Sequence, residues 1–404
     1  MLTYQYSARN PQTGELVKSV VQADSESAAA KLLKQQGLVA TNIAVESKGF
    51  RFGSAKVKAK DRVLFSRQLS TLINAGLPLL QALRSVASQT SEKNLRVILG
   101  QIIGDIEGGS TLAGSMAKHP KVFNQVYIAL VSAGESSGTL DKALERLAVQ
   151  QEKDADLNAK IKGAMIYPIV VLCVMVAVVG FMVIKVLPQV KVMYTSMPGA
   201  NLPLITKVLL AVSDFTVKFW LVELIVIGIL VFLTTKWART GPGKEVVDRW
   251  KMHAWPIGGL FMKVYMARFT RTGETLVASG VPLLQVLGIT SRAVDNVHIE
   301  RAIMRAADKV KAGKSLADSI TNDTNFLPLV PNMIRIGEES GSLEDMMAKV
   351  ADYYEKEVDN EVKNISTIIE PVMMIMLGVV AFIIVAAVLL PIYGLAGQTD
   401  SIGR

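Results

Sequence analysis

The sequence predicts a mainly α-helical, polytopic membrane protein with two homologous cytoplasmic helical bundles, three transmembrane helices and a small N-terminal ββαβ appendage. Three observations support this fold class: a mean hydropathy of +0.35 over 404 residues, three long apolar runs, and an internal duplication. A chain with 50% hydrophobic and only 20% charged residues is too apolar for a disordered protein or an ordinary soluble enzyme.

Residues 1–46 differ from the rest of the chain and predict the α+β appendage. Alternation around Tyr4 and Tyr6 indicates a first strand, and a second strand follows a turn. Asp24 can cap a helix that Gly37 ends, before a last short strand. The first residues lack a basic segment followed by an apolar run, so no cleavable signal peptide is expected.

The remainder of the chain contains two copies of one sequence unit. Residues 65–83 align without gaps to residues 269–287, and ten of these 19 positions are identical. Motif residues of the first copy are Phe65, Arg67, Gly76, Pro78, Gly134, Glu135, Gly138, Leu140, Pro168 and Pro188. Their counterparts are Phe269, Arg271, Gly280, Pro282, Gly337, Glu338, Gly341, Leu343, Pro371 and Pro391. Each copy therefore predicts a helical bundle followed by a span that prolines bound at both ends.

Each bundle is predicted to consist of antiparallel helices. Apolar residues recur at intervals of three and four, which indicates one buried face per helix. The bundles are expected at residues 61–163 and about 265–366, the second within a cytoplasmic region at 236–369. Pro78, which follows a glycine break, suits the first turn of a new helix.

The glycine-containing corners are predicted to join two helices in each copy. Gly138 and Gly341 are expected to take the left-handed backbone conformation that ends a helix. Thr139 and Ser342 follow directly, at the positions where an N-cap residue is needed.

Three apolar runs predict transmembrane helices at residues 164–187, 219–235 and 370–393. The second run is short and contains Glu223. A lysine and a tryptophan nevertheless flank it at each end, which is typical of membrane–water interfaces. The second run is therefore also interpreted as a span.

The distribution of basic residues predicts the orientation. Residues 1–163 hold 21 Lys and Arg against 14 Asp and Glu, and further basic residues follow the second span. The positive-inside rule then places the N-terminus and both bundles in the cytoplasm, and residues 188–218 and 394–404 outside. The basic linker at 47–60 is expected to lie against anionic lipid. No nucleic-acid-binding signature accompanies it, so no nucleic acid is expected as a partner.

One motif could indicate catalysis. The stretch from Gly134 to Gly138 fits the G-x-S-x-G pattern of a hydrolase nucleophile elbow, with Ser136 as the nucleophile. That elbow needs a strand before it, whereas helices are predicted on both sides, and the second copy has Glu339 in place of Ser136. A helix corner is the favoured interpretation, and a membrane serine hydrolase is the alternative.

No cofactor or metal site is expected. The single Cys173 excludes an intramolecular disulfide or a cysteine cluster, and the three histidines are far apart: His119, His253 and His298. Several acids precede the first and third spans, namely Asp154, Asp156, Glu355, Glu357 and Asp359. A solvated helix face is the favoured interpretation of these acids, with a metal or partner contact as the alternative.

Glu223 is an ionisable residue inside or near a span and is therefore a functional candidate. The alternative is that it lies one helical turn from the interface, near Trp220, and directs its carboxylate toward water.

The openings at Phe65 and Phe269, the two G-E-x-S-G-x-L corners and the three spans resemble the PilC/GspF platform proteins of type IV pilus and type II secretion machines. The resemblance covers essentially the whole chain. It implies a non-enzymatic protein of the cytoplasmic (inner) membrane that binds a cytoplasmic hexameric ATPase and passes pilin subunits into a growing filament. Other inner-membrane machine components and further copies of the chain are the remaining partners that it implies.

The expected function is therefore that of a type IV pilus platform. A type II secretion platform, which would assemble pseudopilins, is the alternative because both classes share these motifs. A small transporter is less favoured, since it would need facing polar groups at mid-membrane, where Glu223 alone is available.

Overall fold

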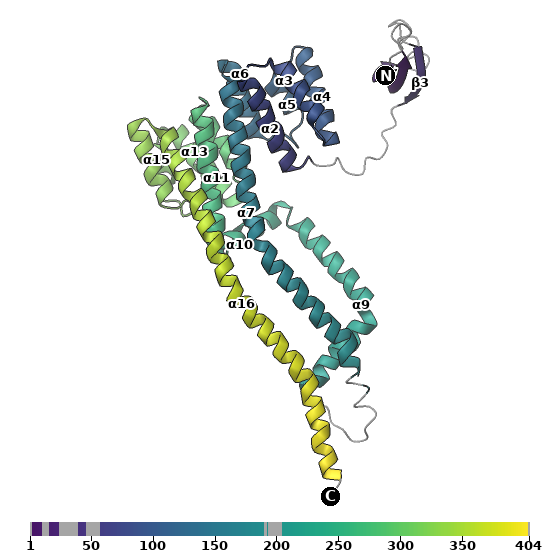
Figure 1. The fold of residues 1–404 in the computed structure, drawn as a ribbon. Coiled ribbons are helices and arrows are strands. Elements are labelled where there is room, and N and C mark those ends of the chain that lie inside the picture. The colour runs from purple at the N-terminus through teal and green to yellow at the C-terminus, as the bar shows by residue number, and fades with distance from the viewer. Residues whose placement is uncertain are drawn as a thin grey trace. The chain divides into compact units, whose positions relative to one another are not determined.

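The computed structural model describes residues 2–9, 16–23, 39–45, 57–189, 192 and 204–402 (Figure 1). The chain divides into two compact units, residues 1–56 and 57–404. The first unit contains an antiparallel sheet in the order β2-β1-β3, with strands β1 (Leu2–Arg9), β2 (Leu16–Ala23) and β3 (Val39–Val45). The helix expected between β2 and β3, and most of the basic linker, lie outside the described residues. The complete ββαβ appendage therefore stays a prediction.

The second unit begins with a helical bundle in the first copy of the repeat. Its helices are α2 (Ala59–Asn74), α3 (Leu79–Gln89), α4 (Lys93–Glu107), α5 (Leu112–Ala117), α6 (Gln125–Ser137) and the start of α7 (Leu140–Phe181). The second copy repeats this order with α11 (Gly258–Ala278), α12 (Leu283–Ala293), α13 (Val297–Lys311), α14 (Leu316–Ile320), α15 (Leu329–Ser340) and α16 (Leu343–Ile402). The mainly helical fold with two repeated bundles is thus confirmed.

Both bundles build their apolar core around the phenylalanine that opens the repeated motif. Phe65 is 1% exposed, and its ring centroid lies 6.0 Å from that of Phe123. The equivalent Phe269 is also 1% exposed and lies 5.5 Å from Phe326. Because such aromatic contacts add to the gain from burial, each pair fixes the first helix of its bundle at the same place.

Among the described residues, three helices are long and apolar enough to cross a membrane, as the sequence predicts: Leu140–Gln189, Leu210–Trp237 and Leu343–Ala386. The first comprises α7, the short π-helix η1 (Met182–Val186) and the residues that follow. The second lies within α9 (Leu204–Trp237), whose helical geometry is interrupted at Phe219. A short helix α10 (Gly241–His253) then leads to the second bundle.

The long helices α7 and α16 belong to a bundle at one end and to a span at the other, and they lie side by side (Figure 1). Pro168 lies inside α7, and Pro371 and Pro391 lie inside α16. The prolines predicted to bound the spans therefore do not end these helices. An interior proline removes one backbone hydrogen bond, but the helix on either side remains the only way to pair the other backbone groups in lipid.

The corners that join α6 to α7 and α15 to α16 have the same geometry. Gly138 and Gly341 both have φ of 71°, which confirms the predicted left-handed conformation. The predicted capping by Thr139 is wrong: its hydroxyl accepts no hydrogen bond from α7 and instead lies 2.7 Å from the Ser137 Oγ. The backbone of Thr139 (φ −110°, ψ 43°) departs from the extended conformation that an N-cap side chain needs.

Replacing Gly138 or Gly341 with valine is expected to destabilise the protein by about 1–3 kcal/mol, because a β-branched residue is strained at positive φ. A Cβ at either position would meet no atom within 4 Å, so the loss would come from the backbone rather than from crowding. Thermal unfolding of the purified chain and its abundance in membranes measure the effect. Ser136→Ala, at an exposed position of the same corner, is the control and should behave like the wild type. Wild-type stability of both valine variants would contradict this role of the corner.

Candidate functional site

An arginine in the first helix of each bundle binds the helix that enters the membrane. Arg67 on α2 donates to both carboxylate oxygens of Glu152 on α7, at 2.6 and 2.5 Å, and its Nη1 donates to Glu145 at 2.8 Å. The Nε of Arg271 on α11 donates to Glu355 on α16 at 2.8 Å. The contact of Arg67 with Glu152 is bidentate, a geometry that is directional as well as strong, whereas Arg271 divides its donors between Glu355 and Asp352. The two clamps therefore fix α7 and α16 relative to their bundles.

The glutamate of each G-E-x-S-G corner holds the N-terminus of a short helix. The Glu135 carboxylate accepts hydrogen bonds from the backbone N–H groups of Leu112 and Ala113 at 2.5 and 2.9 Å, at the start of α5. Glu338 accepts from Leu316 and Ala317 at 2.6 and 2.9 Å, at the start of α14. These N–H groups have no partner within their own helix, and a carboxylate also interacts favourably with the helix dipole.

The first glycine of each corner allows two helices to approach closely. A Cβ at Gly134 would lie 2.5 Å from the Cβ of Ala143 on α7, and a Cβ at Gly337 would lie 2.9 Å from the Cα of Leu343 on α16. Ser136 is exposed on helix α6, and its hydroxyl donates to the carbonyl of Ser132 at 2.8 Å. The helix-corner interpretation is confirmed, because a nucleophile elbow requires a turn between a strand and a helix.

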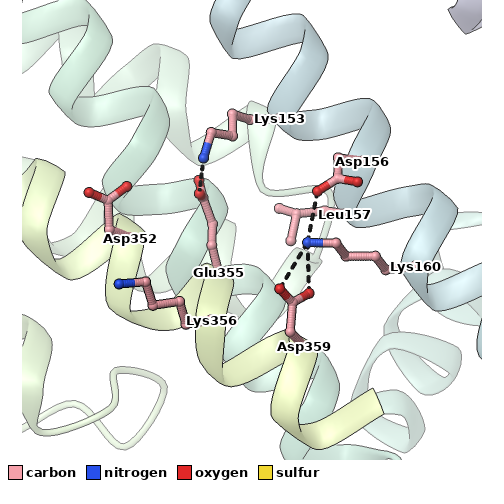
Figure 2. Close-up of a pocket in the computed structure, with 8 residues that line it drawn as sticks. All are labelled: Lys153, Asp156, Leu157, Lys160, Asp352, Glu355, Lys356 and Asp359. Atoms are coloured by element: carbon pink, nitrogen blue, oxygen red, sulfur yellow. Dashed lines mark hydrogen bonds and ion pairs between the residues drawn. The ribbon is translucent and has the colours of Figure 1, made fainter. Parts of the chain in front are cut away.

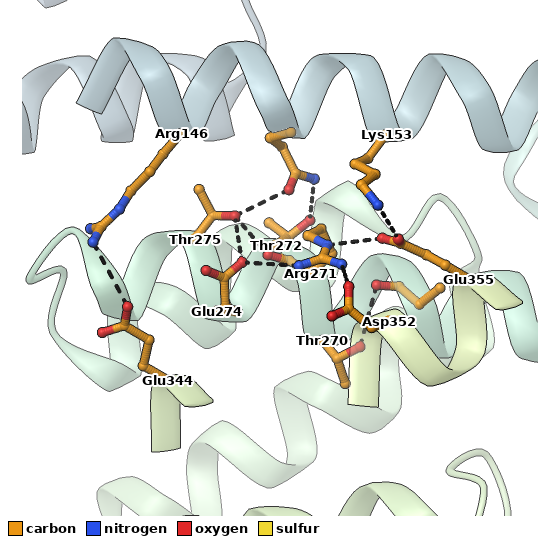
Figure 3. A network of polar contacts seen from close by, with 12 residues as sticks. Arg146, Lys153, Thr270, Arg271, Thr272, Glu274, Thr275, Glu344, Asp352 and Glu355 are labelled. Atoms are coloured by element: carbon orange, nitrogen blue, oxygen red, sulfur yellow. Dashed lines mark hydrogen bonds and ion pairs between the residues drawn. The ribbon is translucent and has the colours of Figure 1, made fainter. Parts of the chain in front are cut away.

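Polar side chains of α7 connect the two bundles (Figure 3). The side-chain amide of Gln150 donates to Thr272 Oγ1 at 3.3 Å and accepts from Thr275 Oγ1 at 3.2 Å, and all three residues are buried. Lys153 donates to Glu355 at 2.8 Å, so this carboxylate joins the second bundle's clamp to the first bundle. The partners come from α11 and α16.

Closer to the membrane, α7 and α16 enclose a small charged cleft of about 130 Å³ (Figure 2). The Lys160 ammonium lies 2.8 Å from Asp156 on its own helix and 2.7 Å from Asp359 on α16. On the other side of α16, Lys263 of α11 contacts Glu357 at 3.0 Å. The acids predicted to form solvated faces therefore make ion pairs between helices, which corrects that expectation for Glu355, Glu357 and Asp359. Among the described residues, no group of three or more potential ligands is arranged to hold a metal ion.

Burial disfavours the ionised form of two carboxyl groups at this contact. Burial raises the pKa of Asp154, and the charge of Glu355 adds to the shift while Arg268 opposes it. Burial likewise raises the pKa of Glu274, although the neighbouring Arg271 opposes the shift. Both carboxylates therefore reduce the stability of the folded protein when they are ionised.

Glu223 lies near the middle of the apolar helix Leu210–Trp237. The apolar helix runs from Leu210 to Trp237, so Glu223 is about 20 Å from Trp237 along the helix axis. Its carboxylate accepts a hydrogen bond of 3.3 Å from Thr216 Oγ1. An intramembrane carboxyl group at this position stays a prediction, as does its alternative near the interface.

Glu152 was not among the predicted site residues, and Glu355 was predicted only as one of several acids on a solvated helix face. Both occupy the same position of the repeat, 203 residues apart, and each binds the arginine of its own copy. An alignment of the two copies extended through the charged part of α7 and α16 would have identified this pair. The contact of Gln150 with Thr272 and Thr275 has no such sequence signal, because the second copy has Tyr353 at the position of Gln150.

Replacing Glu338 with alanine should lower the free energy of unfolding by on the order of 2 kcal/mol, because it leaves two N–H groups of α14 without their acceptor. Glu338→Gln should cost less, since its amide retains one acceptor oxygen. Glu339→Ala alters the adjacent exposed residue and should leave the unfolding temperature unchanged. Equal effects of the two alanine substitutions would refute the capping role.

Asp154→Asn should raise the unfolding temperature at pH ~7, and the gain should shrink as the pH falls toward ~4. The sign follows from the raised pKa: the folded state favours the protonated acid, so wild-type stability is lost as the pH rises through that pKa. Asp308→Asn, at an exposed position of α13, is the control and should show no such dependence. An Asp154→Asn variant that is less stable than the wild type at neutral pH would contradict the assignment.

Known proteins are similar in sequence to this chain over nearly its full length. A family model described as type II secretion system protein F matches residues 65–188 and 269–391, and one described as the N-terminal domain of that protein matches residues 1–44. The type IV pilus assembly protein PilC of Thermus thermophilus is 38% identical over 98% of this chain and 99% of its own length. PilC of Pseudomonas aeruginosa is 37% identical over 90% of the chain and 97% of its own length. Type II secretion system protein F of the same organism is 33% identical over 98% and 99%. The repeated bundle-and-span unit and these matches show that the chain belongs to the PilC/GspF family, which includes type II secretion system protein F.

Proposed function

We propose that this chain is the inner-membrane platform protein of a type IV pilus assembly machine. In this role it couples a cytoplasmic hexameric ATPase to the insertion of pilin subunits into the filament and has no catalytic activity of its own. The observation that carries the proposal is the full-length similarity to PilC, at 38% identity over 98% of the chain. The continuous helices that join each bundle to a span support a mechanical role.

The coupling route runs through the arginine clamps. A force on the first bundle reaches α7 through Arg67 and Glu152, and a force on the second reaches α16 through Arg271 and Glu355. The 42 residues of α7 extend about 63 Å, which is enough to carry a displacement from the bundle across the bilayer. A continuous helix suits this purpose better than a loop.

A platform of a type II secretion system is the second candidate, because protein F of Pseudomonas aeruginosa covers the chain equally well at 33% identity. The higher identity to PilC favours the pilus. A small transporter and a membrane serine hydrolase are less favoured. The first has only Glu223 as an ionisable group near mid-membrane, and the second depends on Ser136, whose hydroxyl is bonded within its own helix.

The proposed orientation places the N-terminus and both bundles in the cytoplasm and the C-terminus outside. In a Cys173→Ser background, a cysteine at Ser136, which is exposed on the first bundle, should resist a membrane-impermeant thiol reagent in intact cells. A cysteine at Ser196, between the first two spans, should react. The reverse labelling pattern would overturn the orientation.

Deletion of the gene should abolish surface pili, and the full chain should restore them. Complementation by Ser136→Ala should succeed and by Gly138→Val should fail, because the corner is structural rather than catalytic. Loss of protein secretion with intact pili would instead favour the secretion platform. If neither phenotype appears, the platform proposal is wrong.

A further inference from the structure

Helix α10 exposes an apolar stripe that no described part of the chain covers. Pro242, Val246 and Trp250 are four residues apart and therefore lie on one face of the helix. Val246 is 55% exposed and Trp250 64%, and Trp255, just beyond the helix, is 80% exposed. Large side chains of this kind are rarely left in water without a function.

The turn before α10 holds the helix against the end of the second span. The Thr240 backbone N–H donates to the carbonyl of Trp237 at 2.9 Å, and the Thr240 hydroxyl donates to the same carbonyl at 2.6 Å. Gly243 packs so closely on Trp237 that a side chain at this position would collide with its carbonyl group. Helix α10 therefore begins where the span leaves the bilayer.

The opposite face of α10 is attached to the second bundle. Asp248 is 1% exposed, and its carboxylate accepts from the backbone N–H of Val297 at the start of α13 at 3.1 Å. Lys244 forms an ion pair with Asp295 at 3.0 Å. These contacts occupy one side of the helix, and the apolar stripe lies on another side.

Basic side chains border the stripe, and Arg249 is close enough to Glu245 of its own helix to interact with it electrostatically. Arg239 and Arg249 are exposed, and neither forms an ion pair within the described part of the chain. Lys236 lies 5.8 Å from the ring centroid of Phe232, at the end of the span. Tryptophan with arginine and lysine beside it is the combination that the interface of an anionic membrane favours.

We infer that α10 and Trp255 form a membrane-surface anchor that lies in the headgroup region of an anionic phospholipid leaflet. Trp250 and Trp255 enter the boundary between headgroups and acyl chains, and Arg239 and Arg249 bind lipid phosphates. The bonds of Asp248 and Lys244 then hold the second bundle at a fixed height above the bilayer. The anchor would have the same role in a pilus machine and in a secretion machine.

Depth-dependent fluorescence quenching tests the anchor in the full-length protein. The chain has four tryptophans, and replacing the other three with phenylalanine leaves Trp250 or Trp255 as the single reporter. In nanodiscs that contain phosphatidylglycerol, lipids brominated near the carbonyl end of the acyl chain should remove more than about half of the fluorescence of each reporter. Lipids brominated near the terminal methyl should quench less.

The matched control is Ile336→Trp in a background without other tryptophans. Ile336 is 49% exposed on α15 of the same bundle and should remain unquenched. Quenching of Trp250 and Trp255 no stronger than that of this control would overturn the anchor and leave the stripe as a surface for a protein partner. If a single-tryptophan chain cannot be reconstituted, the quenching of the wild type is compared with that of the Trp250→Phe/Trp255→Phe double variant. Weaker quenching of the double variant supports the anchor, and equal quenching overturns it.

The lipid charge is tested separately. Arg239→Gln together with Arg249→Gln should reduce the quenching of Trp250 in phosphatidylglycerol discs to the level seen in phosphatidylcholine alone. Lys93→Gln, at an exposed position of α4, removes a positive charge far from the stripe in sequence and should have no effect. Equal quenching in both lipids, unchanged by the double substitution, would overturn the role of the anionic headgroups.

Discussion

The helices α7 and α16 each continue without interruption from a bundle in water to a span in lipid. Near its start α7 buries Leu144 and Leu147 in the first bundle, whereas beyond Ala164 it presents apolar side chains on all sides. A helix meets both demands because its backbone pairs internally in water and in lipid alike. Side chains alone then decide which part belongs to the bundle, and the clamp between Arg67 and Glu152 marks the last strong attachment of α7 to α2.

The two copies have the same internal construction but use different faces to contact each other. The first copy contributes α6 and α7, and the second contributes α11, α12 and α16. Gln150 of the first copy is buried against threonines of α11, whereas its counterpart Tyr353 is 48% exposed. Because the contact joins unlike faces, it does not place equivalent residues opposite one another. The duplication therefore preserved the corners and clamps while the outer faces diverged.

Features that repeat along the chain or depend on local geometry can be predicted from the sequence. Contacts between segments that are distant in the sequence cannot. The left-handed Gly138 follows from its place between two apolar helices, and the spans follow from hydropathy. The role of Glu135 does not, because its partners at the start of α5 are 22 and 23 residues away. Lys153 and Glu355 are 202 residues apart, and no local pattern distinguishes them from other charges on exposed helix faces. The continuation of α7 through Pro168 was also not predicted, because the rule that proline ends a helix is derived from helices in water.

The contacts between the bundles change character toward the membrane. Leu276 and Val286 of the second copy join the apolar core of the first bundle, so that end of the contact is held by buried surface. Nearer the bilayer the contact depends on charged pairs such as Lys160 with Asp359, whose side chains are 33% and 36% exposed. Partly exposed ion pairs contribute little free energy and are screened by salt, whereas apolar burial is lost in full on separation. A change in the spacing of α7 and α16 at the membrane surface therefore costs less free energy than a separation of the bundles.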